Sequence, residues 1–374
     1  MIVGTIRKEK RGNHFMIVEK KSFSVQAYSL ECGRRIPITL GYETYGTLNH
    51  DKSNVILICH YFSATSHAAG KYEETDATPG WWDSLIGPEK AIDTNRFFVI
   101  CTDNLCNVQV KNPRVITTGP ATINPETGKP YGMNFPPFTF RDMAGIQREL
   151  LQSLGINRLY AVAGPSAGGM TALHWAVCYP DMVESCIGVI TNAQNPIITS
   201  CSVLQHAIRA IELDPNWKNG TYYGGQEPVE GLHLASQMMF MGAYTPDWYE
   251  ENFPRSNTSN PTSFEESIYN AIRTNIQYCD ANHWIYTCRA TMLHDIAHGF
   301  PSLEAALSRI QARVLLISCQ QDLLQPSHFS RQTIEQLQQL GKEAAFYEFE
   351  SINGHMGGVF DPHLFEGQIR KWLQ

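Results

Sequence analysis

The chain has 374 residues, of which 43% are hydrophobic and 17% charged, and its formal net charge is −7 at pH 7. This length and composition predict one large α/β domain with an insertion, or two domains, and exclude a disordered chain. A negative balance without a dense Lys/Arg run disfavours nucleic acid as a partner. The first thirty residues lack the apolar core of a signal peptide, and no apolar run approaches a membrane-spanning length. We therefore expect a cytoplasmic protein without a membrane partner.

The ten cysteines are scattered along the chain and predict neither a disulfide framework nor a metal site. Cys59, Cys101 and Cys319 lie in or beside apolar runs, which suits small buried side chains in a reducing compartment. The chain has no Cys-x-x-Cys pair, no His-Glu-x-x-His motif and no Walker loop, and no Gly-x-Gly-x-x-Gly follows a strand-like run. We expect no metal ion and no bound nucleotide cofactor.

Short apolar runs recur along the chain in the way that buried β-strands do. They cover residues 36–40, 55–59, 97–101, 158–163, 186–190 and 314–318, with a further candidate at 344–349. Helix-like segments lie between them, among them 142–154, which Gly155 ends, and 363–373 at the end of the chain. Near-continuous apolar strands that alternate with helices predict an α/β fold with a mostly parallel sheet covered on both faces.

The composition changes between residues 195 and 300, where strand-like runs disappear and helix-like segments alternate with Asn/Gly/Pro breaks. We expect helices at 205–213, 231–241, 263–279 and 284–294. Residues 1–194 and 301–374 would then form the core domain, and 195–300 an inserted helical cap. Such caps cover a pocket at the C-terminal edge of the sheet. The methionine-rich run 238–241 either lines that pocket or only packs between helices.

The most specific motif is Gly164-Pro165-Ser166-Ala167-Gly168, between an apolar strand-like run and a helix-like one. A strand, a Gly-x-Ser-x-Gly turn and a helix predict a nucleophile elbow. The serine of an elbow has a strained backbone, and its flanking residues must lack side chains for strand and helix to pass closely. A Gly-rich turn without function is the alternative for the motif taken alone.

A serine nucleophile needs a histidine base, which in turn needs an acid to orient it. In an elbow fold the order along the chain is serine, acid, histidine. Asp322 follows the run 314–318, and His355 follows the candidate strand 344–349, so both lie in the required loops. Taken singly, Asp322 is also compatible with a turn and His355 with an ordinary loop residue. Their joint occurrence in order predicts the triad Ser166, His355 and Asp322.

Three weaker candidates compete for the roles of acid and base. Asp361 lies after the histidine, and Asp181 lies in a turn behind the elbow helix. His60 ends an early strand and precedes the elbow. The loop that starts at His60 has a second expected role, because an oxyanion hole combines the backbone N–H after the nucleophile with one from such a loop. We expect these donors to be Ala167 and either Tyr61 or Phe62.

Several long motifs resemble those of the homoserine O-acetyltransferase family, whose members have the α/β-hydrolase fold. The resemblance covers nearly the whole chain. It is carried by Gly41-Tyr42-Glu43-Thr44-Tyr45-Gly46, Gly80-Trp81-Trp82-Asp83, Thr127-Gly128-Lys129-Pro130-Tyr131-Gly132, Arg141-Asp142-Met143, the elbow and Asp214-Pro215-Asn216-Trp217.

This resemblance implies a ping-pong reaction in methionine biosynthesis. Ser166 would take an acetyl group from acetyl-CoA, a co-substrate and not a resident cofactor, and pass it to the hydroxyl of L-homoserine. The resemblance also implies a homodimer joined through the cap, and within the cap it assigns Tyr222 and Tyr223 to the substrate site. The sequence leaves open whether the donor carries an acetyl or a succinyl group.

The chain departs from the family pattern at the acceptor site. The family arginine that binds the acceptor falls on Ile208, with Arg209 adjacent as its candidate replacement, and the acidic residue after the catalytic histidine is Met356. The Gly/Cys-rich stretch before Thr118 is replaced by residues 105–111. Two other functions therefore stay open: acyl transfer to a different hydroxylated acceptor, and hydrolysis of esters or thioesters by the same triad. An inactive scaffold is the third alternative.

Overall fold

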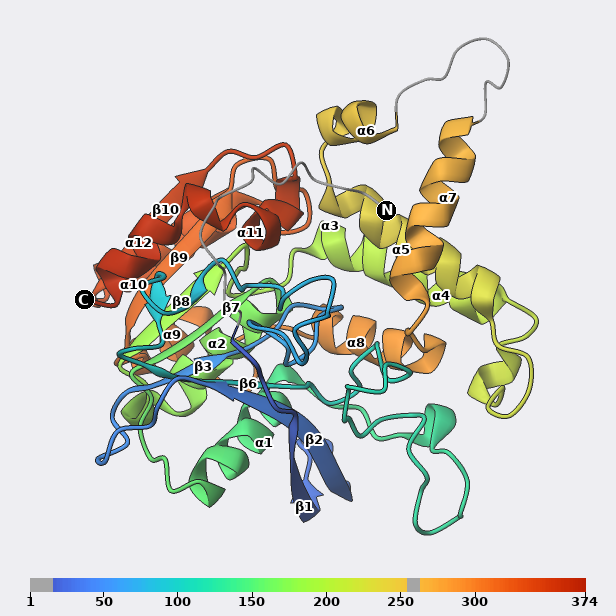
Figure 1. The fold of residues 1–374 in the computed structure, drawn as a ribbon, viewed down its shortest axis with the longest axis horizontal. Helices are drawn as coiled ribbons and strands as arrows, with labels where there is room; N and C mark the ends of the chain where they lie inside the picture. Colours follow the sequence, from blue (N-terminus) through green and yellow to red (C-terminus); the bar gives the residue numbers. More distant parts are fainter. Residues whose placement is uncertain (1–15, 254–262) are drawn as a thin grey trace.

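A computed structural model describes residues 16–253 and 263–374 and contains an eight-stranded sheet in the order β1-β2-β6-β3-β7-β8-β9-β10 (Figure 1). A separate small pair is formed by β4 and β5. The strands are β1 (Lys21–Ser29), β2 (Arg35–Tyr45), β3 (Val55–Ile58), β4 (Ile86–Gly87), β5 (Ile92–Asp93), β6 (Phe98–Thr102), β7 (Ala161–Pro165), β8 (Ser185–Val189), β9 (Arg313–Cys319) and β10 (Ala344–Phe349).

The six strands from β6 to β10 in this order run parallel, whereas β2 pairs antiparallel with β6 and β1 antiparallel with β2. The mostly parallel sheet predicted from the apolar runs is therefore confirmed, including the candidate strand at 344–349. β1 was not predicted. Its side chains are exposed or half-buried, so its sequence lacks the continuous apolar character of the inner strands.

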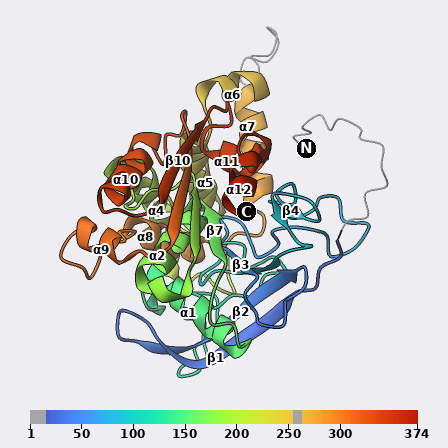
Figure 2. The same cartoon turned by 90° about the vertical axis from the view of Figure 1, so that its left-hand side faces the viewer.

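Helices cover both faces of the sheet. Alternate residues of a strand point to opposite faces, and in the inner strands the residues on both faces are apolar and buried. In β3, Val55 and Leu57 pack with helices α1 (Phe140–Ser153), α2 (Ala167–Cys178), α9 (Leu303–Arg309) and α10 (Ser327–Gln339). Ile56 and Ile58 pack on the other face, with Trp82 and with the end of α12 (Glu366–Trp372). Figure 2 shows α2, α9 and α10 on one side of β10 and α12 on the other.

The expected helical insertion lies between β8 and β9. It contains α3 (Ile197–Thr199), which continues through Ser200–Leu204 into α4 (Gln205–Leu213), then α5 (Val229–Ala243), α6 (Pro246–Asn252), α7 (Ser263–Ile276) and α8 (Ala281–Met292). The short α11 (Gly357–Phe360) follows β10. The insertion leaves and rejoins the core where Gln194 pairs with Asp295. In Figure 1, α3 to α8 gather beside the sheet and form a second layer with its own apolar core.

Helix boundaries differ from the expectation mainly at the end of the chain. The helix expected at 363–373 is interrupted at Phe365, whose φ of −138° is not helical, so α12 begins only at Glu366. α7 ends at Ile276, three residues before the expected end. These shifts leave the loops that follow β7, β9 and β10 at the same edge of the sheet, as parallel strands require.

Candidate active site

Ser166 lies in the tight turn between β7 and α2. Its φ of 53° and ψ of −122° lie outside the regions that L-residues prefer. A side chain on either flanking glycine would collide with the carbonyl oxygen of Cys59, since an added Cβ would lie 2.4 Å from it at Gly164 and 1.9 Å at Gly168. The turn holds its strain through a hydrogen bond from Ser166 N to Val189 O of 2.8 Å. This geometry is that of a nucleophile elbow.

The structure brings Ser166, His355 and Asp322 together in one hydrogen-bonded chain. His355 Nε2 lies 2.8 Å from Ser166 Oγ, and His355 Nδ1 lies 2.6 Å from Asp322 Oδ2. A carboxylate only accepts, so Nδ1 carries the ring proton and Nε2 is free to accept from the serine hydroxyl. This arrangement can remove the serine proton as the serine attacks a carbonyl carbon.

Asp322 is buried in the loop after β9, and both of its carboxylate oxygens have partners. Oδ1 accepts the backbone N–H groups of Leu324 and Gln325, each at 2.8 Å. The Gln325 side chain is itself fixed by Asn192 and Asn195, each at 2.9 Å. Sequence reasoning missed this amide set, because Asn192 and Asn195 lie some 130 residues before Gln325. Because these contacts hold Oδ1 and the loop around it, Oδ2 of Asp322 stays directed at His355.

His355 lies in the loop between β10 and α11. The loop is tied by Asp361, which accepts from Ser351 Oγ at 2.5 Å and from Asn353 Nδ2 at 2.7 Å. Gly354 has a φ of 56°, a value that favours glycine at this turn. Asp361 therefore stabilises the loop that contains His355. The carboxylate that contacts His355 is that of Asp322. The other rival acid, Asp181, accepts from Gln311 at the surface.

The expected oxyanion donors lie beside the serine. Ala167, Tyr61 and Phe62 line the same cavity as Ser166. Within the described ranges, none of their three backbone N–H groups donates a hydrogen bond to the protein. Free N–H groups at the start of a helix and in an adjacent loop suit a developing oxyanion.

His60, the rival base, has a different place in the structure. Its Nδ1 lies 2.7 Å from Tyr61 O, and its Nε2 accepts from Asn104 N at 3.1 Å and from Asn107 Nδ2 at 3.2 Å. Burial lowers the pKa of His60 to about 4, so the ring stays neutral at pH 7. His60 therefore shapes the loop that contains Tyr61 and Phe62.

Ser166 opens into a cavity of about 260 Å³ between the sheet edge and the cap. Met239 and Phe240 line it, whereas Met241 is 62% exposed, so the methionine-rich run contributes only in part. Met356, next to His355, also lines it. None of the described residues that line this cavity is Asp, Glu, Lys or Arg. Their apolar members include Met170, Leu204, Met239, Phe240, Ala243, Ile276, Trp284, Leu324 and Phe360.

The three residues expected to bind substrate do not line this cavity. Arg209 points out of the cap, where its guanidinium, 71% exposed, lies 2.7 Å from Glu212. Tyr222 and Tyr223 donate instead to the buried carboxylate of Asp280, at 2.7 and 3.1 Å. Ile208, at the family arginine position, packs in the apolar core of the cap. The helical register separates neighbours by about 100°, which is why Arg209 does not replace the missing guanidinium.

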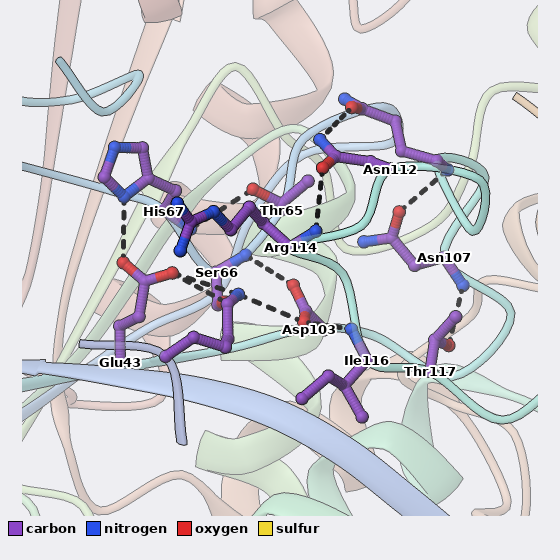
Figure 3. A network of polar contacts seen from close by, with 12 residues as sticks. Glu43, Thr65, Ser66, His67, Asp103, Asn107, Asn112, Arg114, Ile116 and Thr117 are labelled. Atoms are coloured by element: carbon purple, nitrogen blue, oxygen red, sulfur yellow. Dashed lines mark hydrogen bonds and ion pairs between the residues drawn. The ribbon is translucent and has the colours of Figure 1, made fainter. Parts of the chain in front are cut away.

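A buried network of charges lies beside residues 65–67, at the end of the loop that starts at His60 (Figure 3). Glu43 on β2 has no solvent exposure and lies 3.0 Å from Lys20 Nζ and 2.9 Å from His67 Nδ1. Asp103, after β6, accepts the backbone N–H of Ser66 at 2.8 Å. Burial alone would raise the pKa of Glu43, but the His67 hydrogen bond and the Lys20 charge lower it to about 2.

This network predicts acid sensitivity. A folded-state pKa below the ordinary 4.5 means that ionised Glu43 stabilises the fold above pH 4.5, and that this stabilisation is lost as the pH falls toward 2. It amounts to roughly 3 kcal/mol. We expect Glu43→Gln to destabilise the fold at neutral pH and to flatten the decline of stability on acidification, as measured by urea unfolding. The exposed Glu350→Gln is the control; equal pH profiles for wild type and Glu43→Gln would contradict the assignment.

Among residues 16–253 and 263–374, no group of three or more His, Cys, Asp or Glu side chains is arranged to hold a metal ion. No helix in this part of the chain is long and apolar enough to cross a membrane.

The comparisons with known proteins agree with the geometry. The family model described as "alpha/beta hydrolase fold" matches residues 54–362. Curated homoserine O-acetyltransferases are 36% identical over 91% of this chain and 90% of the protein in Carboxydothermus hydrogenoformans, and 39% over 92% and 91% in Symbiobacterium thermophilum. A solved homoserine O-acetyltransferase from Bacillus anthracis is 60% identical with a TM-score of 0.94, covering 96% of this chain and 98% of its own.

Esterases are also similar to this chain. One solved esterase is 41% identical with a TM-score of 0.92, covering 96% of this chain and all of its own. Because the curated relatives match this chain over most of the length of both proteins, they establish its family and show that it is an enzyme. The chain belongs to the homoserine O-acetyltransferase family of α/β-hydrolase-fold enzymes.

Proposed function

We propose that this enzyme transfers an acetyl group from acetyl-CoA to the hydroxyl of L-homoserine through an acyl-enzyme formed on Ser166. The observation that carries the proposal is the hydrogen-bonded chain from Ser166 through His355 to Asp322, at an elbow that opens into a cavity beneath the cap. The acetyl group and the homoserine acceptor are those in the names of the curated relatives, and acetyl-CoA as donor is what the family resemblance implies. The substrates are small molecules, and the reaction needs no resident cofactor.

In the first half-reaction, Ser166 Oγ attacks the thioester carbonyl while His355 Nε2 takes its proton. The carbonyl oxygen becomes an oxyanion and accepts from Ala167 N–H and from Tyr61 or Phe62 N–H. When the tetrahedral adduct collapses, the C–S bond breaks and His355 returns the proton to the departing thiolate. Asp322 keeps the ring oriented and stabilises its protonated form.

In the second half-reaction the acceptor replaces the thiol. Its hydroxyl gives a proton to His355 Nε2 as its oxygen attacks the acyl carbon, and the ester leaves as His355 reprotonates Ser166 Oγ. Water is the competing acceptor at this stage. The apolar residues around the cavity favour transfer, because they limit the water that reaches the acyl-enzyme.

One observation favours a second function, the hydrolysis of uncharged esters. The described lining of the cavity contains no charged Asp, Glu, Lys or Arg side chain to meet the ammonium and carboxylate of homoserine. Met356 and Ile208 occupy the two positions where the family places its charged acceptor ligands. An unpaired charge in such a site costs roughly 2–5 kcal/mol.

Acetyl-CoA turnover with and without homoserine separates the two functions. We expect CoA release that rises with homoserine concentration, together with O-acetylhomoserine detected by mass. Release that ignores homoserine and yields acetate would assign the enzyme to the esterase class. A chromogenic acetyl ester run in parallel reports the first half-reaction in both cases.

We also propose that the protein is cytoplasmic, and that it forms a homodimer joined through the cap, as the family resemblance implies for the dimer. Cys59, Cys101 and Cys319 are free and buried, which suits a reducing compartment and supports this location. Sedimentation of the purified protein tests the dimer independently of activity.

A further inference from the structure

Two side chains that follow β6 fix the loop beside the serine. Gln109 Nε2 donates to Ser63 O at 2.5 Å, and Asn107 Nδ2 donates to Ala64 O at 2.9 Å. A third carbonyl of this loop, Tyr61 O, is held by the His60 ring at 2.7 Å and by Ala64 N at 3.1 Å. The protein therefore holds the carbonyls of the loop, while the N–H groups of its first turn stay free.

The two amides also support each other. Asn107 Oδ1 accepts the backbone N–H of Gln109 at 2.9 Å, and Asn107 Nδ2 lies 3.2 Å from His60 Nε2. Asn112 Nδ2 lies 3.4 Å from Gln109 Oε1. Asn107 is 2% exposed, so no water replaces these bonds when one of them is lost.

The cap holds residues 106–109 from the opposite side. His283 of α8 donates from Nδ1 to Asn107 O at 2.9 Å, and Thr287 Oγ1 donates to Cys106 O at 3.1 Å. Asp280, just before α8, donates its backbone N–H to Val108 O at 2.9 Å. Residues 106–109 thus connect the N-terminal part of a cap helix to the loop beside Ser166.

The far end of the loop has a separate anchor. Figure 3 shows the Asp103 carboxylate between Ser66 and Ile116, with Glu43 beside His67. This anchor fixes residues 66 and 67, whereas residues 61–64 are held by His60, Asn107 and Gln109. The N–H of Phe62 belongs to the same peptide group as Tyr61 O, which the His60 ring and Ala64 N hold. Asn107 bonds to both His60 and Ala64 O, and Gln109 bonds to Ser63 O, so the two amides support the turn that presents the free N–H groups.

We propose that Asn107 and Gln109 are positioning residues of the oxyanion hole. They lie in the stretch 105–111, which departs from the family pattern, so this chain holds its oxyanion loop with its own side chains. The proposal rests on the acyl-enzyme chemistry proposed above, but not on the identity of the acceptor. Loss of one oxyanion donor lowers kcat by about 10²–10³-fold, so misdirecting a donor through the loss of a supporting bond lowers it less.

The direct test is Gln109→Met, which keeps the length of the side chain and removes the donor. With p-nitrophenyl acetate, which reports acyl-enzyme formation whatever the acceptor, we expect kcat to fall about tenfold and KM to change less than about twofold. The Ki of a trifluoromethyl ketone, whose adduct carries the oxyanion, should rise by the same factor. Gln311→Met, which removes a surface amide bonded to Asp181, is the matched control.

Asn107→Leu removes two donors and is expected to cost more, but it also leaves Ala64 O unpaired in the interior. If Asn107→Leu does not fold, the kcat and Ki of Gln109→Met, a change at a half-exposed residue, test the proposal alone. An unchanged kcat and Ki for Gln109→Met, or a loss confined to KM, would overturn the proposal. A wild type that lacks esterase activity and covalent labelling of Ser166 would instead contradict the proposed function, so the two failures are distinguishable.

Discussion

Ser166→Ala is expected to lower kcat for acyl transfer by at least about 10⁴-fold, because no other group reaches the acyl carbon in the way that Ser166 Oγ does. The oxyanion donors and His355 remain in the variant, so only the residual catalysis by these groups survives. CoA release from acetyl-CoA and turnover of an acetyl ester should fall together, since both depend on the same first step.

The fold should survive this change. Alanine meets the same backbone strain at a φ of 53°, and it loses only the hydroxyl that bonds to His355. We expect the free energy of unfolding to stay within about 1 kcal/mol of wild type. A fluorophosphonate probe should label the wild type and not the variant. Wild-type turnover in the folded variant would refute the mechanism.

Asp322→Asn should lower kcat by about 10⁴-fold through the wrong tautomer of His355. An asparagine at this position keeps its oxygen toward the two N–H donors, Leu324 N and Gln325 N, and presents its NH₂ group to His355 Nδ1. Nδ1 must then accept, the proton moves to Nε2, and Nε2 no longer takes a proton from Ser166.

Asp361→Asn is the matched control for this variant. Asp361 also binds within the histidine loop, but it accepts from Ser351 and Asn353 and has no bond to His355. We expect a loss smaller than that of Asp322→Asn by at least about tenfold. Equal losses in the two variants would mean that Asp322 acts only by shaping its loop.

The strands and the triad residues, in their order along the chain, could be predicted from the sequence because each depends on a local sequence pattern. Apolar runs buried on both faces have no competing explanation, and the elbow is dictated by sterics at Gly164 and Gly168. Asp322 and His355 were found by their loops, and the structure places both within hydrogen-bond distance of their partners. β1 escaped detection because its polar residues make an edge strand that is mostly exposed.

The cap residues could not be placed in the same way. Whether Arg209 or Tyr222 faces the cavity depends on how the helices dock, and one residue along a helix changes the direction by about 100°. Tyr222 and Tyr223 donate hydrogen bonds to Asp280, which lies 57 or more residues further along the chain. The side chains of Asn107 and Gln109 form hydrogen bonds with the backbone of a different loop. Such contacts produce no periodic pattern in the sequence, so they could not be predicted from it.

If Ser166 carries the acyl group between the two substrates, rapid quenching followed by peptide mass spectrometry should detect that group on Ser166. Enzyme mixed with acetyl-CoA alone should accumulate one acetyl group on the peptide that contains Ser166. Added homoserine should discharge that group as O-acetylhomoserine. An unmodified Ser166 during rapid CoA release, or an acetyl group on another residue, would contradict the account.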